Sequence, residues 1–444
     1  MRVVFPDPEK MEAAGFGSIA FCPFLLTDKG TYPREMNRYI RERALVEWIP
    51  TLKSSGSSEE GWVRRIEFQT KASLETMARR LVDFSRWLEL SKSDWRTLKY
   101  SDLLLKWQAG LLEGTCSASG RPLRVKTVNG RVQEATMFLC WAAERELRPQ
   151  FVVPLIRGRA NIQNNGDHAF SQKAKIVVHR VGVLPLRPSK LALPSPADVD
   201  KWLAQVELLK GPIKRLCCEL IITTGMRIAE VVQWRVDTLP PHNRWELVDG
   251  KVSVNIKWGV KGGKTSPGSL EGTKDRDILV PLELANRIEH YRTWQRPRLI
   301  AKWVRHAKSK EERNVRARIT KSDRMWLSEN TFSPFSSNQL YQDWTRLPAC
   351  PINWHPHKGR EYFAVELLVG HTRSLLESQG ANATPRMDWL VGTLGSQVRV
   401  LLTPLLGHVS EKTSSIYLKA VWARLASEVE HPAMSWRNFQ DKER

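Results

Sequence analysis

The stretch TTGMRIAEVVQW, residues 223–234, decides how the C-terminal half of this chain is built. An apolar helical run precedes it, the Thr-Thr-Gly break interrupts that run, and a second helical pattern follows. Arg227 is therefore expected at the start of a helix, beside the positive end of the helix dipole. That position is unfavourable for a surface cation, and a nearby phosphate would remove the penalty.

Three further motifs follow in the chain: HPHKGR at 355–360, LLGH at 405–408 and SSIYLKA at 414–420. They contain His357, Arg360, His408 and Tyr417. His357 and Arg360 are three residues apart, a spacing that places both on one face of a helix. Two arginines and two histidines can surround a phosphodiester, and a tyrosine can attack it.

Phosphoryl transfer needs neutralised non-bridging oxygens, an in-line nucleophile and a protonated leaving group. Arginine suits the first task because its planar fork stays charged and binds phosphate oxygens in pairs. Tyr417 must lose its proton as it attacks, since a phenol has a pKa near ~10. His357 could take that proton or hold a phosphate oxygen, and His408 could hydrogen-bond the phosphate. Each motif alone also fits a surface arginine, a helix-capping histidine or a buried tyrosine.

Taken in order, the motifs resemble those of the tyrosine recombinases, or integrases. TTGMRIAEVVQW resembles their first arginine motif, HKGR their HxxR box, and LLGH with SSIYLKA their last histidine and nucleophilic tyrosine. The strand-like segments VSVNIKW and RDILVPL resemble their β-hairpin. The likeness covers roughly residues 195–425, and the helical region 60–150 looks like their core-binding domain.

This resemblance implies a 3′-phosphotyrosyl intermediate, a free 5′-hydroxyl and rejoining without ATP. It also implies a lysine on the hairpin as general acid. Lys274 fits best because GTKDRDILVPL matches the family's lysine followed by a basic residue and VPL, while Lys261 and Lys264 remain alternatives. Glu230 matches the family's acidic position and is expected to orient Arg227 or a neighbour.

Two segments depart from the family pattern. The gap between Arg360 and His408 is about two dozen residues longer than usual, so the segment 371–398 is interpreted as an inserted helix pair, with His371 structural. The stretch 292–324 holds twelve Lys or Arg against three acids. It is either a solvated helix face or a phosphate-contacting insert.

The expected fold is mainly α with a small antiparallel β-hairpin. The expected domains are an N-terminal extension of unknown role (1–58), a helical, SAM-like core-binding domain (59–150), a linker (151–195) and a catalytic domain (196–444). Apolar residues at three- and four-residue steps predict helices within 70–90, 101–112 and 127–145. Ser195-Pro196 predicts the start of a further helix.

Composition narrows the function classes. The chain has 444 residues and 69 Lys and Arg against 47 Asp and Glu, a net charge of +22 that favours a polyanionic partner. Its six scattered cysteines form no CxxC pair, which indicates a reducing cytoplasm. No signal peptide or membrane span is evident. No cofactor is expected, and neither a metal-ligand set nor the acidic cluster of a two-metal nuclease is evident.

The sequence therefore predicts a site-specific DNA recombinase that serves a mobile element, acts on double-stranded DNA in the cytoplasm at the nucleoid, and assembles four protomers in a synapse, with accessory proteins as further candidate partners. Two alternatives remain open. One is a DNA relaxase of the type IB topoisomerase kind, which shares the site. The other is a DNA-binding accessory protein whose active site is inert.

Overall fold

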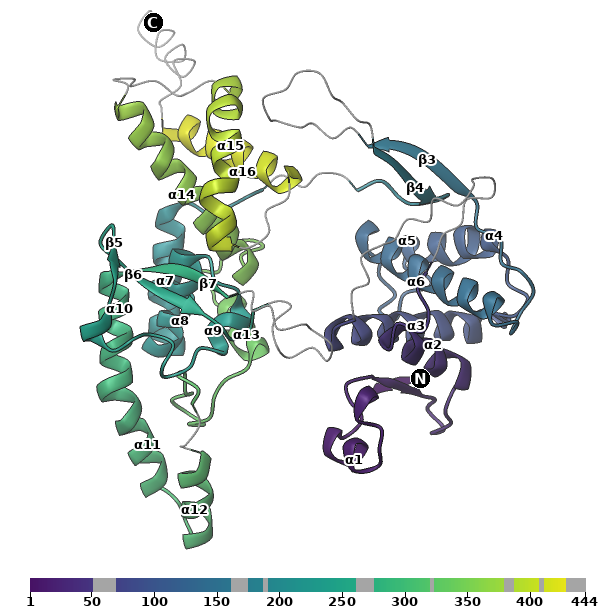
Figure 1. The fold of residues 1–444 in the computed structure, drawn as a ribbon, viewed down its shortest axis with the longest axis horizontal. Helices are drawn as coiled ribbons and strands as arrows, with labels where there is room; N and C mark the ends of the chain where they lie inside the picture. The colour runs from purple at the N-terminus through teal and green to yellow at the C-terminus, as the bar shows by residue number, and fades with distance from the viewer. Residues whose placement is uncertain are drawn as a thin grey trace, which may run out of the picture. The chain divides into compact units, whose positions relative to one another are not determined.

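The computed structural model describes residues 1–50, 69–160, 175–186, 191–260, 275–319, 323–378, 387–406 and 411–428. The described chain is mostly helical, and its strands form three small antiparallel sheets (Figure 1). The predicted fold class, mainly α with a small antiparallel sheet, is confirmed. The chain divides into two compact units, with the boundary between Pro188 and Ser189.

The first unit is built around long amphipathic helices. Thr70 caps α3, its side chain accepting a hydrogen bond from the Ser73 amide at 3.2 Å. The predicted apolar stripes are buried, including Phe84 and Phe138 at 0 % exposure. The helical elements are α1 (Pro8–Ala13), η1 (Gly17–Ile19), α2 (Arg34–Ala44), α3 (Lys71–Ser91), α4 (Tyr100–Asp102), the π-helical η2 (Leu103–Gln108), α5 (Ala109–Glu113) and α6 (Val125–Glu144).

Residues 1–50, the described part of the segment interpreted as an N-terminal extension, pack into the core of this unit. Strands β1 (Arg2–Val4) and β2 (Phe24–Leu26) pair, and α2 lies against α6. The Tyr39 hydroxyl donates to Glu134 Oε1 at 2.7 Å, and Trp141 Nε1 donates to Glu42 Oε2 at 2.8 Å. These buried polar pairs tie residues about a hundred positions apart, which no local periodicity could indicate.

Part of the segment interpreted as a linker, 151–195, is also folded. Strands β3 (Leu155–Ala160) and β4 (Lys175–Arg180) form an antiparallel pair. The chain after β4 is held by the helices: the Tyr100 hydroxyl donates to the Val181 carbonyl at 2.6 Å, and Gln108 Nε2 donates to the Gly182 carbonyl at 3.0 Å.

The second unit opens at the predicted Ser195-Pro196 start, where the Ser195 hydroxyl accepts from the Asp198 amide at 3.2 Å. Strands β6 and β7 form the predicted antiparallel hairpin, with Val254 opposite Ile278. The elements to this point are α7 (Pro196–Lys210), α8 (Pro212–Thr224), α9 (Ile228–Val232), η3 (His242–Arg244), β5 (Leu247–Val248), β6 (Lys251–Ile256) and β7 (Arg276–Pro281).

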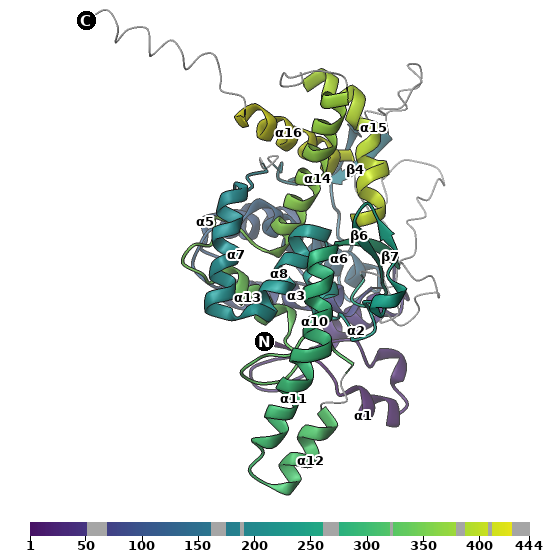
Figure 2. The same ribbon diagram turned by 90° about the vertical axis from the view of Figure 1, so that its left-hand side faces the viewer.

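Helices complete the second unit, in which α14, α15 and α16 lie together (Figure 2). One core surrounds Trp202 and Trp344, and another lies between these three helices. The extra length between Arg360 and His408 extends two helices, since 371–378 continue α14 and 387–398 open α15. The remaining elements are α10 (Leu282–His290), the π-helical η4 (Tyr291–Gln295), α11 (Arg296–Arg305), α12 (Lys310–Ile319), α13 (Ser337–Thr345), α14 (Pro356–Ser378), α15 (Met387–Leu406) and α16 (Glu411–Glu428). Over the described residues, no helix combines the length and the apolar character that a membrane crossing needs.

Candidate active site

The break between α8 and α9 positions Arg227. Gly225 ends α8 in the left-handed region, at φ 68° and ψ 21°. A Cβ at Gly225 would lie 2.5 Å from Phe363 Cδ1 and 2.7 Å from Leu406 Cδ2. Only glycine therefore lets α8, α14 and α15 approach so closely. Arg227 follows as the N-cap residue of α9, confirming the predicted helix start.

Glu230 is the buried acceptor at the centre of the site. Its Oε2 accepts from the Arg227 amide at 2.7 Å, and its Oε1 accepts from Arg227 Nη1 at 2.8 Å. Arg276 donates to both carboxylate oxygens, each at 2.6 Å. Burial alone would raise the pKa of Glu230, but the hydrogen bonds from Arg276 and Arg227 hold it below its ordinary value.

Sequence reasoning missed Arg276 as a member of this site. Its side chain is 8 % exposed, and its Nε donates to the Leu405 carbonyl at 2.8 Å. The strand pattern held a signal, because Arg276 alternates with the buried Ile278 and Val280 along β7. A basic side chain on the buried face of a strand needs a buried hydrogen-bonding or charged partner.

Arg360 projects from α14 into the same place. It is 7 % exposed and donates to the Gly225 and Leu406 carbonyls. Arg227 Nη2 lies 3.4 Å from that Leu406 carbonyl. Burial, followed by the nearby Arg227 and Arg276, lowers the pKa of Arg360. Three guanidinium groups thus meet the carbonyl end of α15, where the helix dipole is negative.

Tyr417 lies on α16 within the core shared with α14 and α15, at 6 % exposure. Burial and the Glu361 carboxylate raise the pKa of its hydroxyl to about 12, and Arg360 acts in the opposite direction. The phenol is therefore within electrostatic reach of Arg360. Glu361 is a second residue near the site that the sequence patterns did not single out.

The structure corrects the expectation that His357 and Arg360 share a face of their helix. The His357 side chain is 72 % exposed, whereas Arg360 is buried. His357 Nε2 lies 3.6 Å from Glu361 Oε1, and Lys358 Nζ lies 2.7 Å from Glu361 Oε2. Residues three apart differ by about 60° around a helix, so one can face the core and the other solvent.

Four predicted residues fall outside the described part of the chain: His408, Lys274 and the alternatives Lys261 and Lys264. Their roles stay predictions. His371, interpreted as structural, lies within α14. Among the described residues there is no group of three or more His, Cys, Asp or Glu that could hold a metal ion.

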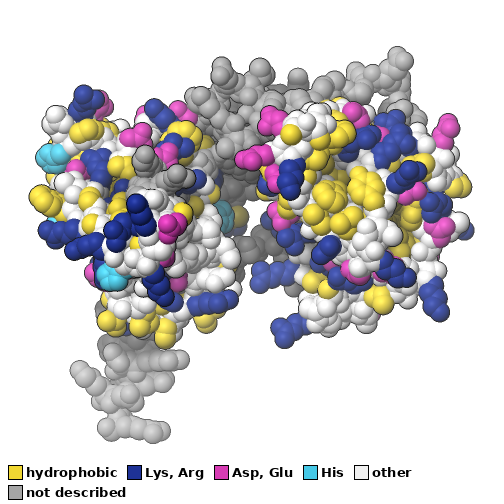
Figure 3. All heavy atoms as spheres, turned by 90° about the horizontal axis from the view of Figure 1, so that it is seen from below, with side chains coloured by type: hydrophobic (Ala, Val, Ile, Leu, Met, Phe, Trp, Pro, Cys, Tyr) yellow, Lys and Arg dark blue, Asp and Glu magenta, His cyan; other side chains and the backbone are white. Residues whose placement is uncertain are grey.

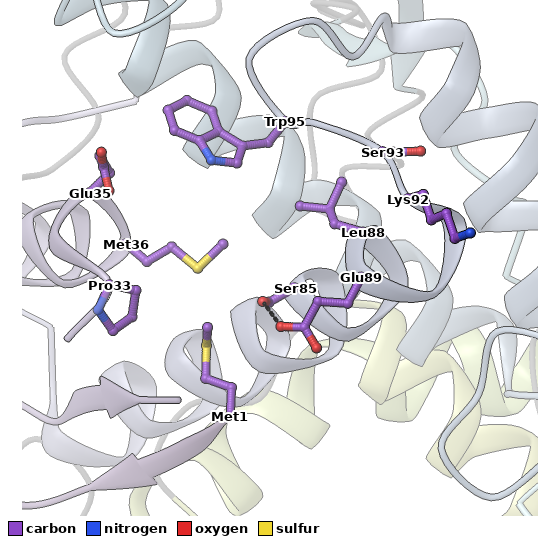
Figure 4. A pocket seen from close by; sticks show the side chains of 10 residues that line it. All are labelled: Met1, Pro33, Glu35, Met36, Ser85, Leu88, Glu89, Lys92, Ser93 and Trp95. Carbon is purple, nitrogen blue, oxygen red and sulfur yellow. Dashed lines mark hydrogen bonds between the residues drawn. The ribbon is translucent and has the colours of Figure 1, made fainter. Parts of the chain in front are cut away.

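A pocket of about 400 Å³ lies in the first unit (Figure 4). The side chains of Met1, Met36, Leu88 and Trp95 turn toward it, with Glu35 and Glu89 at its edge. None of the predicted catalytic residues lines this pocket. The cluster of Arg227, Arg276 and Arg360 in the second unit is therefore a better candidate for an active site than this pocket.

Neither a protein-family model nor a curated protein matches this sequence. Solved structures that it resembles include recombinases and integrases. One is the XerH site-specific recombinase in a post-cleavage complex with its palindromic difH substrate, at 16 % identity and a TM-score of 0.43, covering 81 % of this chain and 79 % of that chain.

Two further structures are similar. A lambda integrase dimer bound to a COC′ core site has 13 % identity and a TM-score of 0.41, and covers 87 % of this chain and 94 % of that chain. The Tn1549 transposon integrase in complex with circular intermediate DNA has 15 % identity and a TM-score of 0.39, and covers 80 % of this chain and 91 % of that chain.

Proposed function

We propose that this chain is a tyrosine-type site-specific DNA recombinase that cleaves and rejoins DNA through a 3′-phosphotyrosyl bond. One observation carries the proposal. The guanidinium groups of Arg227, Arg276 and Arg360 gather around one carboxylate and the end of α15, and Arg360 also acts electrostatically on the Tyr417 hydroxyl. Serving a mobile element and assembling four protomers on two duplexes belong to the same proposal.

The charge balance of the site favours an anion. Three guanidinium charges face one carboxylate, Glu230, which leaves an excess of two positive charges. The lowered pKa of Arg360 means that its charged form is held at a cost, and a bound phosphate would relieve that cost. The Arg227 side chain is 31 % exposed, so it can reach a phosphate from solvent.

In the proposed reaction the Tyr417 oxygen attacks phosphorus and the P–O5′ bond breaks. The proton of Tyr417 passes to a base, and O5′ departs with a proton from an acid. Arg227 and Arg360 neutralise the non-bridging oxygens, His408 hydrogen-bonds the phosphate, and Lys274 is the acid. Attack by a second 5′-hydroxyl reverses these steps and joins new strands.

The proton of Tyr417 needs an acceptor during the step. With a pKa of about 12, the hydroxyl is protonated at neutral pH. His357 can take this role only if its imidazole turns from solvent toward the site, because its side chain is 72 % exposed. His357 therefore stays a proposed base or phosphate contact that acts once DNA is bound.

Capture of a covalent adduct tests the proposal. Wild type, Tyr417→Phe and Tyr362→Phe would each be incubated with a library of labelled, nicked suicide duplexes, and adducts would be resolved by denaturing electrophoresis. Tyr362 is a matched control because it is also a buried helical tyrosine, 9 % exposed, on α14. Wild type and Tyr362→Phe should form the adduct, and Tyr417→Phe should not.

The same samples separate the alternatives. An adduct that persists in Tyr417→Phe would refute the assigned nucleophile. DNA binding by the wild type with no adduct on any duplex would favour the inert accessory protein. The duplex that forms the adduct supplies the site for a second assay. Crossover products from two marked duplexes that carry this site indicate a recombinase, whereas relaxation of supercoils alone indicates the topoisomerase-like enzyme.

A further inference from the structure

Helices α11 and α12 form an extension of the second unit, called here the arm (Arg296–Ile319). Figures 1 and 2 show α11 and α12 running from α10 away from α14, α15 and α16. The arm lies inside the basic stretch 292–324, whose charge has no role in the proposed chemistry. The question is whether its cations stabilise the arm or are presented to a partner.

Some of these cations do hold the arm in place. Arg296 is buried, and its Nη2 donates to the Arg324 carbonyl at 2.9 Å. Arg316 Nη2 donates to Glu312 Oε1 at 2.5 Å, and its guanidinium lies 5.3 Å from the centre of the Trp303 ring. Trp303 in turn stacks on Phe332, with ring centroids 6.1 Å apart. The arm is therefore anchored along one side.

Other cations are presented to solvent. Arg298, Lys302 and Arg305 are all exposed on α11, and among the described residues no carboxylate pairs with any of them. Their spacing of four and three residues places them within an arc of about 60° on the helix surface. Trp303, which carries the anchoring contacts, lies about 130° away from the centre of this stripe.

We propose that the stripe Arg298–Lys302–Arg305 binds the phosphate backbone of duplex DNA outside the cleaved phosphodiester. The three cations rise about 10 Å along the helix, a span that reaches two neighbouring phosphates of one strand. A row of phosphates is the natural partner of exposed cations that lie on one side of a supported helix and pair with no carboxylate among the described residues. Figure 3 shows Lys and Arg side chains spread over the face of the unit from which the arm projects. The choice of DNA among polyanions rests on the proposed function.

The test measures how DNA binding by the full chain depends on salt. A variant with Arg298→Gln, Lys302→Gln and Arg305→Gln would be titrated onto a labelled duplex of arbitrary sequence at several salt concentrations. Each phosphate contact contributes about 0.9 to the slope of log K against log salt, so the loss of two contacts should lower the slope by about 2. Binding at low salt should weaken by at least about tenfold.

A matched control removes the same charge elsewhere in the unit. Lys201, Arg244 and Arg346 are also two arginines and one lysine, all exposed, but they lie on different elements. Their combined change to Gln should leave the slope within about one of the wild-type value. An arm variant whose slope matches the wild type, or falls no further than that of the control, would overturn the proposal.

Two further readouts complete the test. Binding to anionic vesicles and to duplex RNA is measured with the same variants, and a loss seen there but not on DNA would also overturn it. Adduct formation at saturating protein distinguishes the two proposals. An unchanged slope with an intact Tyr417 adduct refutes only the arm, whereas a reduced slope without any adduct from the wild type refutes only the reaction.

Discussion

At the scale of single residues, Glu230 determines how the cationic site is held together. Its side chain is fully buried and accepts hydrogen bonds from two arginines that come from different elements, α9 and β7. Without such a carboxylate, the burial of Arg276 would leave a charge with no compensating partner. Glu230 thus links the stability of the fold to the presentation of Arg227.

Replacing Glu230 by Gln should therefore destabilise the protein by about 3 kcal/mol, because it leaves buried guanidinium charge unbalanced. Urea unfolding measures this loss. Glu366→Gln is the control, since Glu366 pairs with Arg424 at 2.8 Å but is 30 % exposed, and it should cost less than about 1 kcal/mol. Equal losses in the two variants would contradict a central role for Glu230.

At the scale of elements, the end of α8 decides whether the site can form. The Gly225 carbonyl accepts from Arg360, and its missing side chain leaves room for Phe363 and Leu406. The same turn determines where α9 starts and therefore where its N-cap residue, Arg227, lies. Gly225 therefore allows α8, α14 and α15 to pack closely. Helix α14 carries Arg360, and the ends of α8 and α15 accept its hydrogen bonds.

Gly225→Ala should cost about 3 kcal/mol, combining left-handed strain of about 1 kcal/mol with steric overlap in a packed interior. Gly250→Ala separates the two effects, because Gly250 has φ 69° with nothing within 4 Å of the position of an added Cβ. It should lose only about 1 kcal/mol. Thermal unfolding measures both variants, and a loss for Gly225→Ala no larger than that of the control would show that the overlap is relieved by movement of the neighbours.

At the scale of the whole molecule, each compact unit buries its own core. Phe138 lies in the core of the first unit, and Ile221 lies in one of the two cores of the second. Both side chains are fully buried. Units with separate cores are expected to unfold separately unless a large apolar interface joins them.

Scanning calorimetry of the full chain should therefore show two transitions. Phe138→Ala and Ile221→Ala should each cost about 3 kcal/mol, and each should lower the midpoint of only one transition. The two variants serve as controls for each other. A single transition that both substitutions move together would show that the units unfold as one.

The sequence by itself determined the helices with strong periodicity, the Ser195-Pro196 start, the β6–β7 hairpin and the place of Arg227 at a helix start. These features depend on local spacing, capping and turn chemistry, which a short window of residues contains. The resemblance to the tyrosine recombinases also drew attention to Glu230, which matches an acidic position of that family.

Only the tertiary structure decided which side chains meet. Arg276 reaches Glu230 from a strand 46 residues away, and Arg360 reaches the carbonyl of Leu406 from another helix. The packing of α14 turned His357 to solvent and Arg360 inward, although their spacing suggested a shared face. Packing against elements distant in the sequence determines which side chains are buried and which ones are in contact. A local sequence pattern does not indicate which distant element packs against it.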